Sequence, residues 1–235
     1  MNPAELARRA GAGAALAASG WALPALAPIA PPVAHAMGLP RRIDRPGAVA
    51  ITFDDGPHAE GTAAVLEALA RAGALATFFM VGEQVDRNRA LAAEVVAAGH
   101  GIGIHGYRHR NQLRLTAAQQ ADDLMRAEST IAEATGTRPS VHRPAYGIFS
   151  WPGLAFVRGR GWEPLLWSRW GRDWAARATP ESIASKVSAG LTGGDVLLLH
   201  DADTYSVEGS HRRTAAALPL VLEAIQRAGL EPVPV

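Results

Sequence analysis

Short apolar runs alternate with longer amphipathic stretches from residue 45 to the end of the chain. A glycine stands directly after each of the four clearest amphipathic stretches, where helices commonly end in a left-handed residue. Strands that alternate with helices form parallel sheets or barrels. The pattern predicts an α/β fold with seven strands over residues 48–53, 75–81, 101–105, 138–142, 163–167, 195–199 and 231–235, and helices over 60–72, 88–98, 116–135 and 214–228.

Two helix starts carry sequence signals of their own. Thr116 followed by Gln119 fits a capping box, and Thr179 followed by Pro180 fits an N-cap with proline in the first helical position. The chain shows no internal repeat after residue 40. Its 235 residues, 48% of them hydrophobic, suffice for a single domain with a substantial core and an N-terminal extension.

Polar clusters follow five of the predicted strands. In α/β barrels the chemistry is found where strands end and loops begin, so we expect these clusters on one rim of the fold. They are Asp54-Asp55, His105 to His109 (HGYRH), Arg143 to Gly147 (RPAYG), Trp170 to Trp174 (WGRDW) and His200-Asp201.

The histidines of the second cluster have metal-ligand spacing. His105 and His109 are separated by three residues, which lets two imidazoles bind one ion, although this pair alone is a weak signal. An aspartate as third ligand would complete a set that leaves coordination positions open, as in catalytic zinc sites. Imidazole ligands and the absence of cysteine favour Zn²⁺, and Co²⁺, Ni²⁺ or iron would also suit them.

The segment TFDDGP, residues 52–57, places two adjacent carboxylates at the end of an apolar strand. A buried carboxylate is unfavourable unless it is paired, hydrogen-bonded or bound to a metal. Adjacent strand residues point to opposite faces, so the two side chains are not expected to share one role. We therefore expect one aspartate to bind the metal and the other to act as a base toward water.

Taken in order over residues 45–235, these motifs resemble the NodB-homology polysaccharide deacetylases, carbohydrate esterase family 4. The resemblance implies a distorted barrel with fewer than eight strands, in agreement with the seven predicted above. It also implies that Asp54 is the general base and that Asp55, His105 and His109 bind the metal.

The later motifs of the family imply further site residues. Arg143 would hold the base, and the backbone N–H of Tyr146 would face the oxyanion, where one donor typically contributes about 10²–10³ in rate. Trp174 and Leu198 match the fourth and fifth motifs. Both would offer apolar surface to the sugar and the acetyl methyl group.

The resemblance also implies that His200 is the general acid, with Asp173 in the Asp-Trp position of the fourth motif. An amine leaves poorly unless it is protonated, so His200 must be charged when the bond breaks. The carboxylate of Asp173 would favour that charged form.

Three residues depart from the usual motifs. Gly106 stands where the family has Ser or Thr after the first metal-binding histidine, Ala145 replaces the second proline of Arg-Pro-Pro-Tyr, and Trp170 replaces the first aspartate of the fourth motif. None of these changes removes a ligand or a proton-transfer residue. They bear on the identity of the substrate, because the fourth motif borders the sugar site.

The sequence therefore predicts a metal-dependent hydrolase of carbon–nitrogen bonds other than peptide bonds. Its substrate would be an N-acetylated (or O-acetylated) carbohydrate, such as an N-acetylglucosamine polymer or a cell-wall glycan. The 23 basic and 22 acidic residues give no electrostatic reason to expect a nucleic-acid partner, and we expect a monomer.

Four other functions share parts of this sequence pattern. A deformylase or deacetylase of a lipid-linked amino sugar, and a non-catalytic carbohydrate-binding relic, would share the same fold. A haloacid-dehalogenase-type phosphatase needs Asp-x-Asp rather than adjacent aspartates. A glycosidase using Asp54 with Asp173 would leave the histidine pair and Arg143 without a role.

The N-terminal residues 1–36 differ in composition from the catalytic domain expected over residues 37–235. Arg8-Arg9 is followed by an uncharged stretch, residues 10–40, and Ala34-His35-Ala36 fits a signal-peptidase site. These features predict a cleaved signal peptide and a secreted or envelope-associated protein. A membrane anchor is the second reading, since the stretch is long enough to span a bilayer, and a disordered leader or misplaced start the third.

Overall fold

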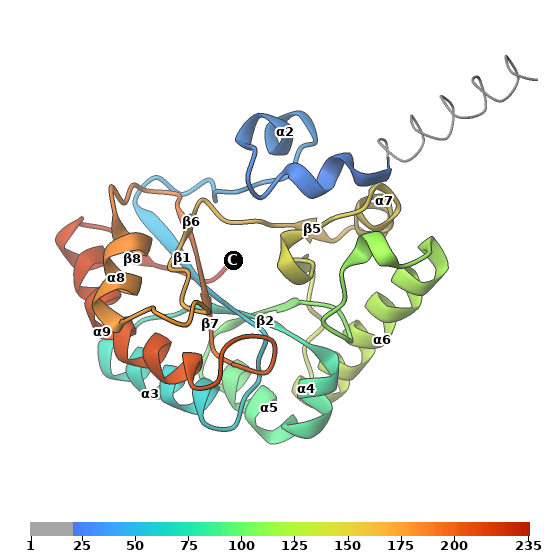
Figure 1. The fold of residues 1–235 in the computed structure, drawn as a ribbon. Helices are drawn as coiled ribbons and strands as arrows, with labels where there is room; N and C mark the ends of the chain where they lie inside the picture. The colour runs from blue at the N-terminus through green and yellow to red at the C-terminus, as the bar shows by residue number, and fades with distance from the viewer. Residues whose placement is uncertain (1–20) are drawn as a thin grey trace, which may run out of the picture.

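A curled parallel sheet forms the centre of residues 21–235, the part of the chain that the computed structural model describes (Figure 1). The strands lie in the order β5-β4-β3-β2-β1-β7-β6, and β8 pairs with β1. The predicted α/β fold with a distorted barrel is confirmed. The strands are β1 (Ala48–Asp54), β2 (Thr77–Met80), β3 (Gly101–Ile104), β4 (Val141–His142), β5 (Glu163–Pro164), β6 (Arg169–Trp170), β7 (Val196–His200) and β8 (Glu231–Pro232).

Strand β1 is the central element of the sheet. Every residue from Ala48 to Asp54 is buried, as expected for a parallel strand covered on both faces. The strand pairs with β2, with β7 and, through its first residues, with β8. In the register with β7, Asp54 lies opposite His200, so the first and last sequence motifs meet at one end of the sheet.

Strand β6 was not predicted. It consists of two residues that pair with β7, Arg169 opposite Leu197 and Trp170 opposite Leu198. A two-residue pairing leaves no periodic signal in a sequence, and the apolar run over 163–167 yields only the short β5. The polar cluster that begins at Trp170 therefore starts inside a strand.

The helices cover the outside of the sheet (Figure 1). The four predicted over 60–72, 88–98, 116–135 and 214–228 are present, and the caps at Thr116 and Thr179 are both capping boxes. Two short helices after β2 and after η3 were missed, because neither has a long amphipathic period. The helical elements are η1 (Leu23–Leu26), α2 (Pro31–Ala36), α3 (Gly61–Ala72), α4 (Gly82–Arg87), α5 (Arg89–Ala97), η2 (Gln112–Arg114), α6 (Ala117–Thr135), η3 (Ala145–Gly147), α7 (Trp151–Gly159), α8 (Pro180–Ser188) and α9 (Ser210–Arg227).

The predicted leader divides into two parts. Residues 1–20 lie outside the described residues, whereas residues 21–36 form η1 and α2 at one edge of the barrel (Figure 1). Cleavage after Ala36 stays a prediction. Within residues 21–235, no helix has both the length and the hydropathy that a membrane span requires.

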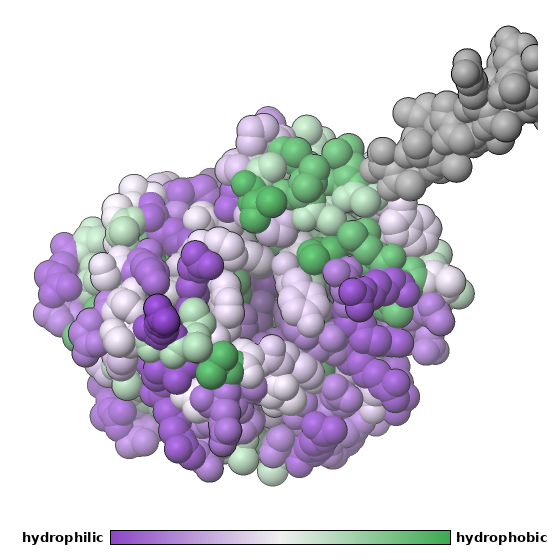
Figure 2. Space-filling model, viewed as in Figure 1, coloured by the Kyte–Doolittle hydropathy of each residue, from purple (hydrophilic) through white to green (hydrophobic). Residues whose placement is uncertain are grey.

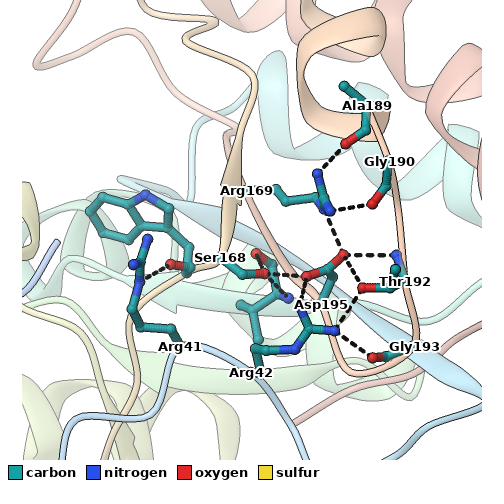
Figure 3. Close-up of polar contacts among 11 residues, drawn as sticks. Arg41, Arg42, Ser168, Arg169, Ala189, Gly190, Thr192, Gly193 and Asp195 are labelled. Carbon is teal, nitrogen blue, oxygen red and sulfur yellow. Dashed lines mark hydrogen bonds and ion pairs between the residues drawn. The ribbon is translucent and has the colours of Figure 1, made fainter. Parts of the chain in front are cut away.

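A buried carboxylate joins three segments at the start of β7 (Figure 3). Asp195 is fully buried. Its carboxylate accepts hydrogen bonds from Arg42 Nη1 and Arg169 Nε, each at 2.6 Å, and from Ser168 Oγ at 2.7 Å. Arg169 also donates to the carbonyl oxygens of Ala189 and Gly190, which follow α8. This network fixes the segment before β1 and the short strand β6 to the start of β7, at the end of the sheet opposite the polar clusters.

Replacing Asp195 with alanine should lower the free energy of unfolding by about 3 kcal/mol. This is the lower end of the range for removing one partner of a buried ion pair. We expect the lower end because Arg42 and Arg169 keep contact with solvent. Urea unfolding measures the change. Glu223→Gln is the control, because Glu223 forms an exposed ion pair with Arg227 on α9 and should change stability little. Equal unfolding midpoints for the two variants would contradict the role given to Asp195.

Candidate active site

A cavity of about 510 Å³ lies at the carboxyl ends of the central strands. Of the ten predicted site residues, all except Arg143 and Asp173 line it, and these two are fully buried beside it. The structure therefore brings together the five clusters that the sequence spreads over residues 54–201. The lining residues from the prediction are Asp54, Asp55, His105, His109, Tyr146, Trp174, Leu198 and His200.

Asp55, His105 and His109 form a compact group of potential ligands, whose nearest ligand atoms all lie within 4.8 Å of one another. Asp55 Oδ1 is 3.4 Å from His105 Nε2 and 3.3 Å from His109 Nε2. These distances match the edges of a tetrahedral site with metal–ligand bonds of about 2.0–2.1 Å. Asp55 Oδ1 is buried without a hydrogen-bond partner, which is unfavourable unless a cation completes the site.

The tautomer of His105 suits a metal ligand. Its Nδ1 lies 2.8 Å from the carbonyl oxygen of Arg143, so Nδ1 carries the proton and Nε2 turns a lone pair toward Asp55. Burial, opposed by Asp55, lowers the pKa of His109 to about 4, which keeps that ring neutral at neutral pH. Burial alone would raise the pKa of Asp55, but the facing histidines lower it to about 2. The group thus offers one carboxylate and the ring nitrogens that a cation needs.

A second His/Asp group fits a metal less well. Atoms of His58, Asp203 and His211 also lie within 4.8 Å of one another. However, His58 Nδ1 accepts a hydrogen bond from the backbone N–H of Gly61 at 3.0 Å, so its neutral ring carries the proton on Nε2, the atom that faces Asp203 at 3.6 Å. A protonated nitrogen binds no metal, so we assign none to this group.

Asp54 is held by a different partner from its neighbour. Arg143 Nη1 donates to Asp54 Oδ1 at 2.7 Å and to Thr52 Oγ1 at 2.8 Å. The second oxygen of Asp54, Oδ2, lies 3.8 Å from His105 Nε2 and faces the ligand group. The adjacent aspartates therefore occupy distinct environments, as the sequence predicted.

Backbone geometry explains how the two carboxylates separate. Asp54 is the last residue of β1, and Asp55 adopts a φ of 84°, which is uncommon for a residue with a side chain. The turn carries the Asp55 side chain toward the histidines rather than to the opposite face of the sheet. Tyr146, with φ 61°, is a second such residue at the rim of the cavity. Positive φ at non-glycine residues clusters at functional sites.

His200 and Asp173 form a closely bonded pair. His200 Nδ1 lies 2.9 Å from Asp173 Oδ1, and Asp173 Oδ2 accepts the backbone N–H of His200 at 2.7 Å and the hydroxyl of Thr214 at 2.8 Å. Burial acts to lower the pKa of His200, but the Asp173 carboxylate, with Asp55 and Asp54, raises it to about 10. The ring is therefore protonated at neutral pH, and a cation bound nearby would reduce this effect.

The loop that carries His109 is braced by a residue that sequence reasoning missed. Gly106 has a φ of 87°, and a Cβ there would lie 3.0 Å from Asp123 Oδ2. Asp123, on α6, accepts the backbone N–H groups of Tyr107 at 2.9 Å and Arg108 at 3.3 Å. Its carboxylate thus braces the loop that begins at Gly106. No local signal marks Asp123, because it is 17 residues away along the chain.

Tyr205 was also missed. Its ring stacks on His109 with centroids 4.3 Å apart, and its hydroxyl donates to Glu83 at 2.7 Å. Trp167 and Trp170 complete the apolar wall with Trp174. The position of Tyr205, five residues after His200 in a loop without periodicity, gives no sequence signal of this contact.

Comparison with known proteins places the chain in a family. The family model described as polysaccharide deacetylase matches residues 41–154. A chitooligosaccharide deacetylase of Azorhizobium caulinodans is 33% identical over 193 residues, which cover 78% of this chain and 91% of that protein. This chain belongs to the polysaccharide deacetylase family. The resemblance predicted from the motifs is confirmed, although the family model ends before Asp173 and His200.

One further relative is much longer than this chain, and one solved structure is of similar length. A peptidoglycan-N-acetylglucosamine deacetylase of Listeria monocytogenes is 30% identical over 183 residues, which cover 78% of this chain but 37% of that protein. The chain thus spans little more than a third of the Listeria relative. The solved structure of a family 4 carbohydrate esterase from Streptomyces lividans, in complex with acetate, superposes with a TM-score of 0.72 at 31% identity and covers 80% of this chain and 92% of that one.

Asp123→Asn should weaken metal binding by about 10–100-fold, the usual effect of removing a partner that orients a ligand. The amide no longer accepts both loop N–H groups, so His109 loses its fixed position. Isothermal titration of the metal-free protein with Zn²⁺ measures the affinity. Asp122→Asn is the matched control, because Asp122 is the exposed neighbour on the same helix. Equal affinities in the two variants would contradict the bracing role.

Proposed function

We propose that the chain is a metal-dependent hydrolase that removes acetyl groups from an acetylated carbohydrate. The observation that carries the proposal is the separation of the adjacent aspartates: Asp55 faces two histidines, whereas Asp54 is bonded to Arg143. One carboxylate is thus available to a cation and the other to a proton. The membership of the polysaccharide deacetylase family supports the substrate class.

Asp55, His105 and His109 would hold the cation, with Zn²⁺ as the ion that the donor set favours and Co²⁺ or Ni²⁺ as alternatives. A cation bound there would supply Lewis acidity, which lowers the pKa of water and polarises an acyl oxygen. Two nitrogens and one carboxylate leave room for both the water and the substrate. The fit of these three residues rests on the unpartnered Asp55 Oδ1 and on the tautomer of His105.

Asp54 would act as the general base. Arg143 occupies its Oδ1 and leaves Oδ2 free to accept the proton of the attacking water. The backbone N–H of Tyr146, at the rim of the cavity, would donate to the oxyanion that forms at the acyl carbon. Trp174 and Leu198 would contact the sugar and the acetyl methyl group.

His200 would deliver the proton to the leaving nitrogen. With Nδ1 bonded to Asp173, its Nε2 is the atom left to donate into the cavity. Asp173 would act through His200, by holding its orientation and its charge, rather than on the substrate. A non-catalytic relic of the fold is not favoured, because the chain keeps every residue to which this proposal gives a ligand or proton-transfer role.

The catalytic domain would occupy residues 37–235, as predicted, and the protein would act in the cell envelope or outside the cell. The support for this location is that a relative from Listeria monocytogenes acts on peptidoglycan, by its name. Chitooligosaccharides are the second candidate substrate, because the Azorhizobium caulinodans relative acts on them. A lipid-linked amino sugar remains the alternative outside these polymers.

The direct test is release of acetate from acetylated substrates by the purified full-length protein. Peptidoglycan, chitin oligomers, poly-N-acetylglucosamine and acetylxylan should be compared, with and without a chelator. We expect acetate from at least one of them, loss of activity after chelation and recovery on adding Zn²⁺ or Co²⁺. Unchanged activity in the metal-free protein would contradict the proposal.

Asp173→Asn should move the alkaline limb of the rate–pH profile to lower pH. The reacting form of His200 is protonated, so activity is present below its pKa and is lost as pH rises through it. Removing the Asp173 charge lowers that pKa from its raised value of about 10. A bound cation lowers the pKa in both proteins, so the sign of the difference is unaffected.

The substrate provides the control for this variant. An activated ester has a leaving group that needs little protonation, so Asp173→Asn should lose much less rate on the ester than on an acetamide. Metal content should stay unchanged. An unmoved alkaline limb, or equal losses on the two substrates, would show that Asp173 does not tune the acid.

A further inference from the structure

A second cavity, of about 530 Å³, adjoins the catalytic cavity on the side of the loop that carries His109. His109 and Tyr146 line both cavities, so the two are direct neighbours. Most of the remaining lining comes from the segment between β3 and α6. In Figure 2, the surface over that segment, to the right of the central hollow, includes strongly hydrophilic side chains. We call this second cavity the arginine cavity.

The arginine cavity carries positive charge. Arg110 and Arg114 line it, and none of its lining residues is acidic. Arg110 pairs with Asp123 Oδ1 at 2.5 Å, whereas Arg114 is exposed and pairs with no carboxylate in the part of the chain that the structure describes. The catalytic cavity, by contrast, is lined by the carboxylates of Asp54 and Asp55. The two neighbouring cavities therefore differ in the sign of their charge.

The polar side chains that line the arginine cavity on this segment offer hydrogen-bond donors. Asn111 Oδ1 accepts the backbone N–H of Leu113 at 2.9 Å, so the side-chain NH₂ group of Asn111 is left to donate. Asp123 holds Arg110 in place but does not satisfy all of its donors, because Arg110 Nε is buried without a hydrogen-bond partner. Guanidinium groups bind carboxylates through two parallel hydrogen bonds. The arginine cavity is therefore suited to an anionic acceptor.

We propose that the arginine cavity binds a carboxylate of the glycan substrate, on a sugar next to the one that loses its acetyl group. The inference rests on the proposed function, because it names which acetylated carbohydrate the same site takes. Since the two cavities share His109 and Tyr146, a group bound in the arginine cavity lies one wall away from the reacting acetyl group. Peptidoglycan has this chemistry, because its N-acetylmuramic acid carries a lactyl carboxylate. Chitin oligomers carry no charge.

Arg114 would act on substrate binding rather than on the chemical step. It is not among the residues that would hold the cation or move a proton. Its removal should raise the concentration of acidic glycan that half-saturates the enzyme and leave turnover at saturation unchanged. For a neutral glycan, neither quantity should change.

The test compares a carboxylate with its neutral counterpart on the same glycan. The probe is a tetrasaccharide of alternating N-acetylglucosamine and N-acetylmuramic acid without peptide, and its counterpart has the lactyl carboxylates converted to amides. Isothermal titration uses the full-length protein with Asp54→Asn, so that the ligand is not hydrolysed. We expect the acid to bind about 10-fold more tightly than the amide, the usual contribution of one hydrogen bond to a charged group. High salt should reduce the difference.

Substitutions in the same protein assign the difference to the arginine cavity. Arg114→Gln should weaken binding of the acid about 10-fold and leave binding of the amide unchanged. Arg114→Lys keeps the charge without the planar fork and should lose less. Arg45→Gln is the matched control, because it removes the same charge from an exposed arginine before β1, at the opposite end of the sheet from the polar clusters. It should bind both ligands as tightly as the protein with Asp54→Asn alone.

Three results would overturn the inference. They are equal affinities for the acid and the amide, no measurable binding of the acid, and equal affinities of Arg114→Gln and Arg45→Gln for the acid. The proposed function is judged separately, by acetate release from the unaltered protein. Acetate release without discrimination between acid and amide would contradict the inference alone, whereas tight binding of the acid with no acetate released from any substrate would contradict the proposed function alone.

Discussion

The buried guanidinium of Arg143 is the interaction on which the site depends. The side chain is fully buried, and an unpaired charge there would be strongly unfavourable. Its donors are satisfied by Thr52 and Asp54 on β1 and by the carbonyl oxygens of Leu165 and Leu166 after β5, while its plane lies over the ring of Phe79. One side chain thus joins the middle of the sheet to its far edge and fixes the carboxylate beside the metal group.

This constraint separates two chemically identical neighbours. Asp54 is held within the strand by Arg143, and the chain then turns through a positive φ at Asp55. The turn lets the second carboxylate meet the histidines that follow β3. A site that needs both a ligand and a free base can therefore be built from consecutive residues. His200, opposite Asp54 in the register of β1 and β7, brings the proton donor to the same strand ends.

Much of this arrangement could be predicted from the sequence, because each element carries a local signal. These signals each span only a few residues of sequence. They are the apolar run before Asp54, the spacing of His105 and His109, and the glycines that follow helices. The contacts of Asp123 and Tyr205 could not be predicted, since they join segments that are distant along the chain. Strand β6 has two residues, which are too few to show an alternation of apolar and polar positions.

The N-terminal segment was harder for a different reason. A run of alanine and proline without charge is typical of an export signal, and the predicted cleavage rests on that composition. The same small residues let Ala27 and Ala34 pack flush against the domain. Composition therefore predicts an export signal, whereas it gives no sign of the packing that residues 21–36 make in the structure.

The central claim is that Asp54 and Asp55 have different functions because different partners hold them. Metal content and turnover of Asp54→Asn and Asp55→Asn, measured side by side over a range of Zn²⁺ concentrations, test it most directly. The account predicts that Asp54→Asn retains the metal and loses nearly all turnover, whereas Asp55→Asn loses the metal first. If both variants lost metal equally and regained turnover equally at high Zn²⁺, the division of functions would be wrong.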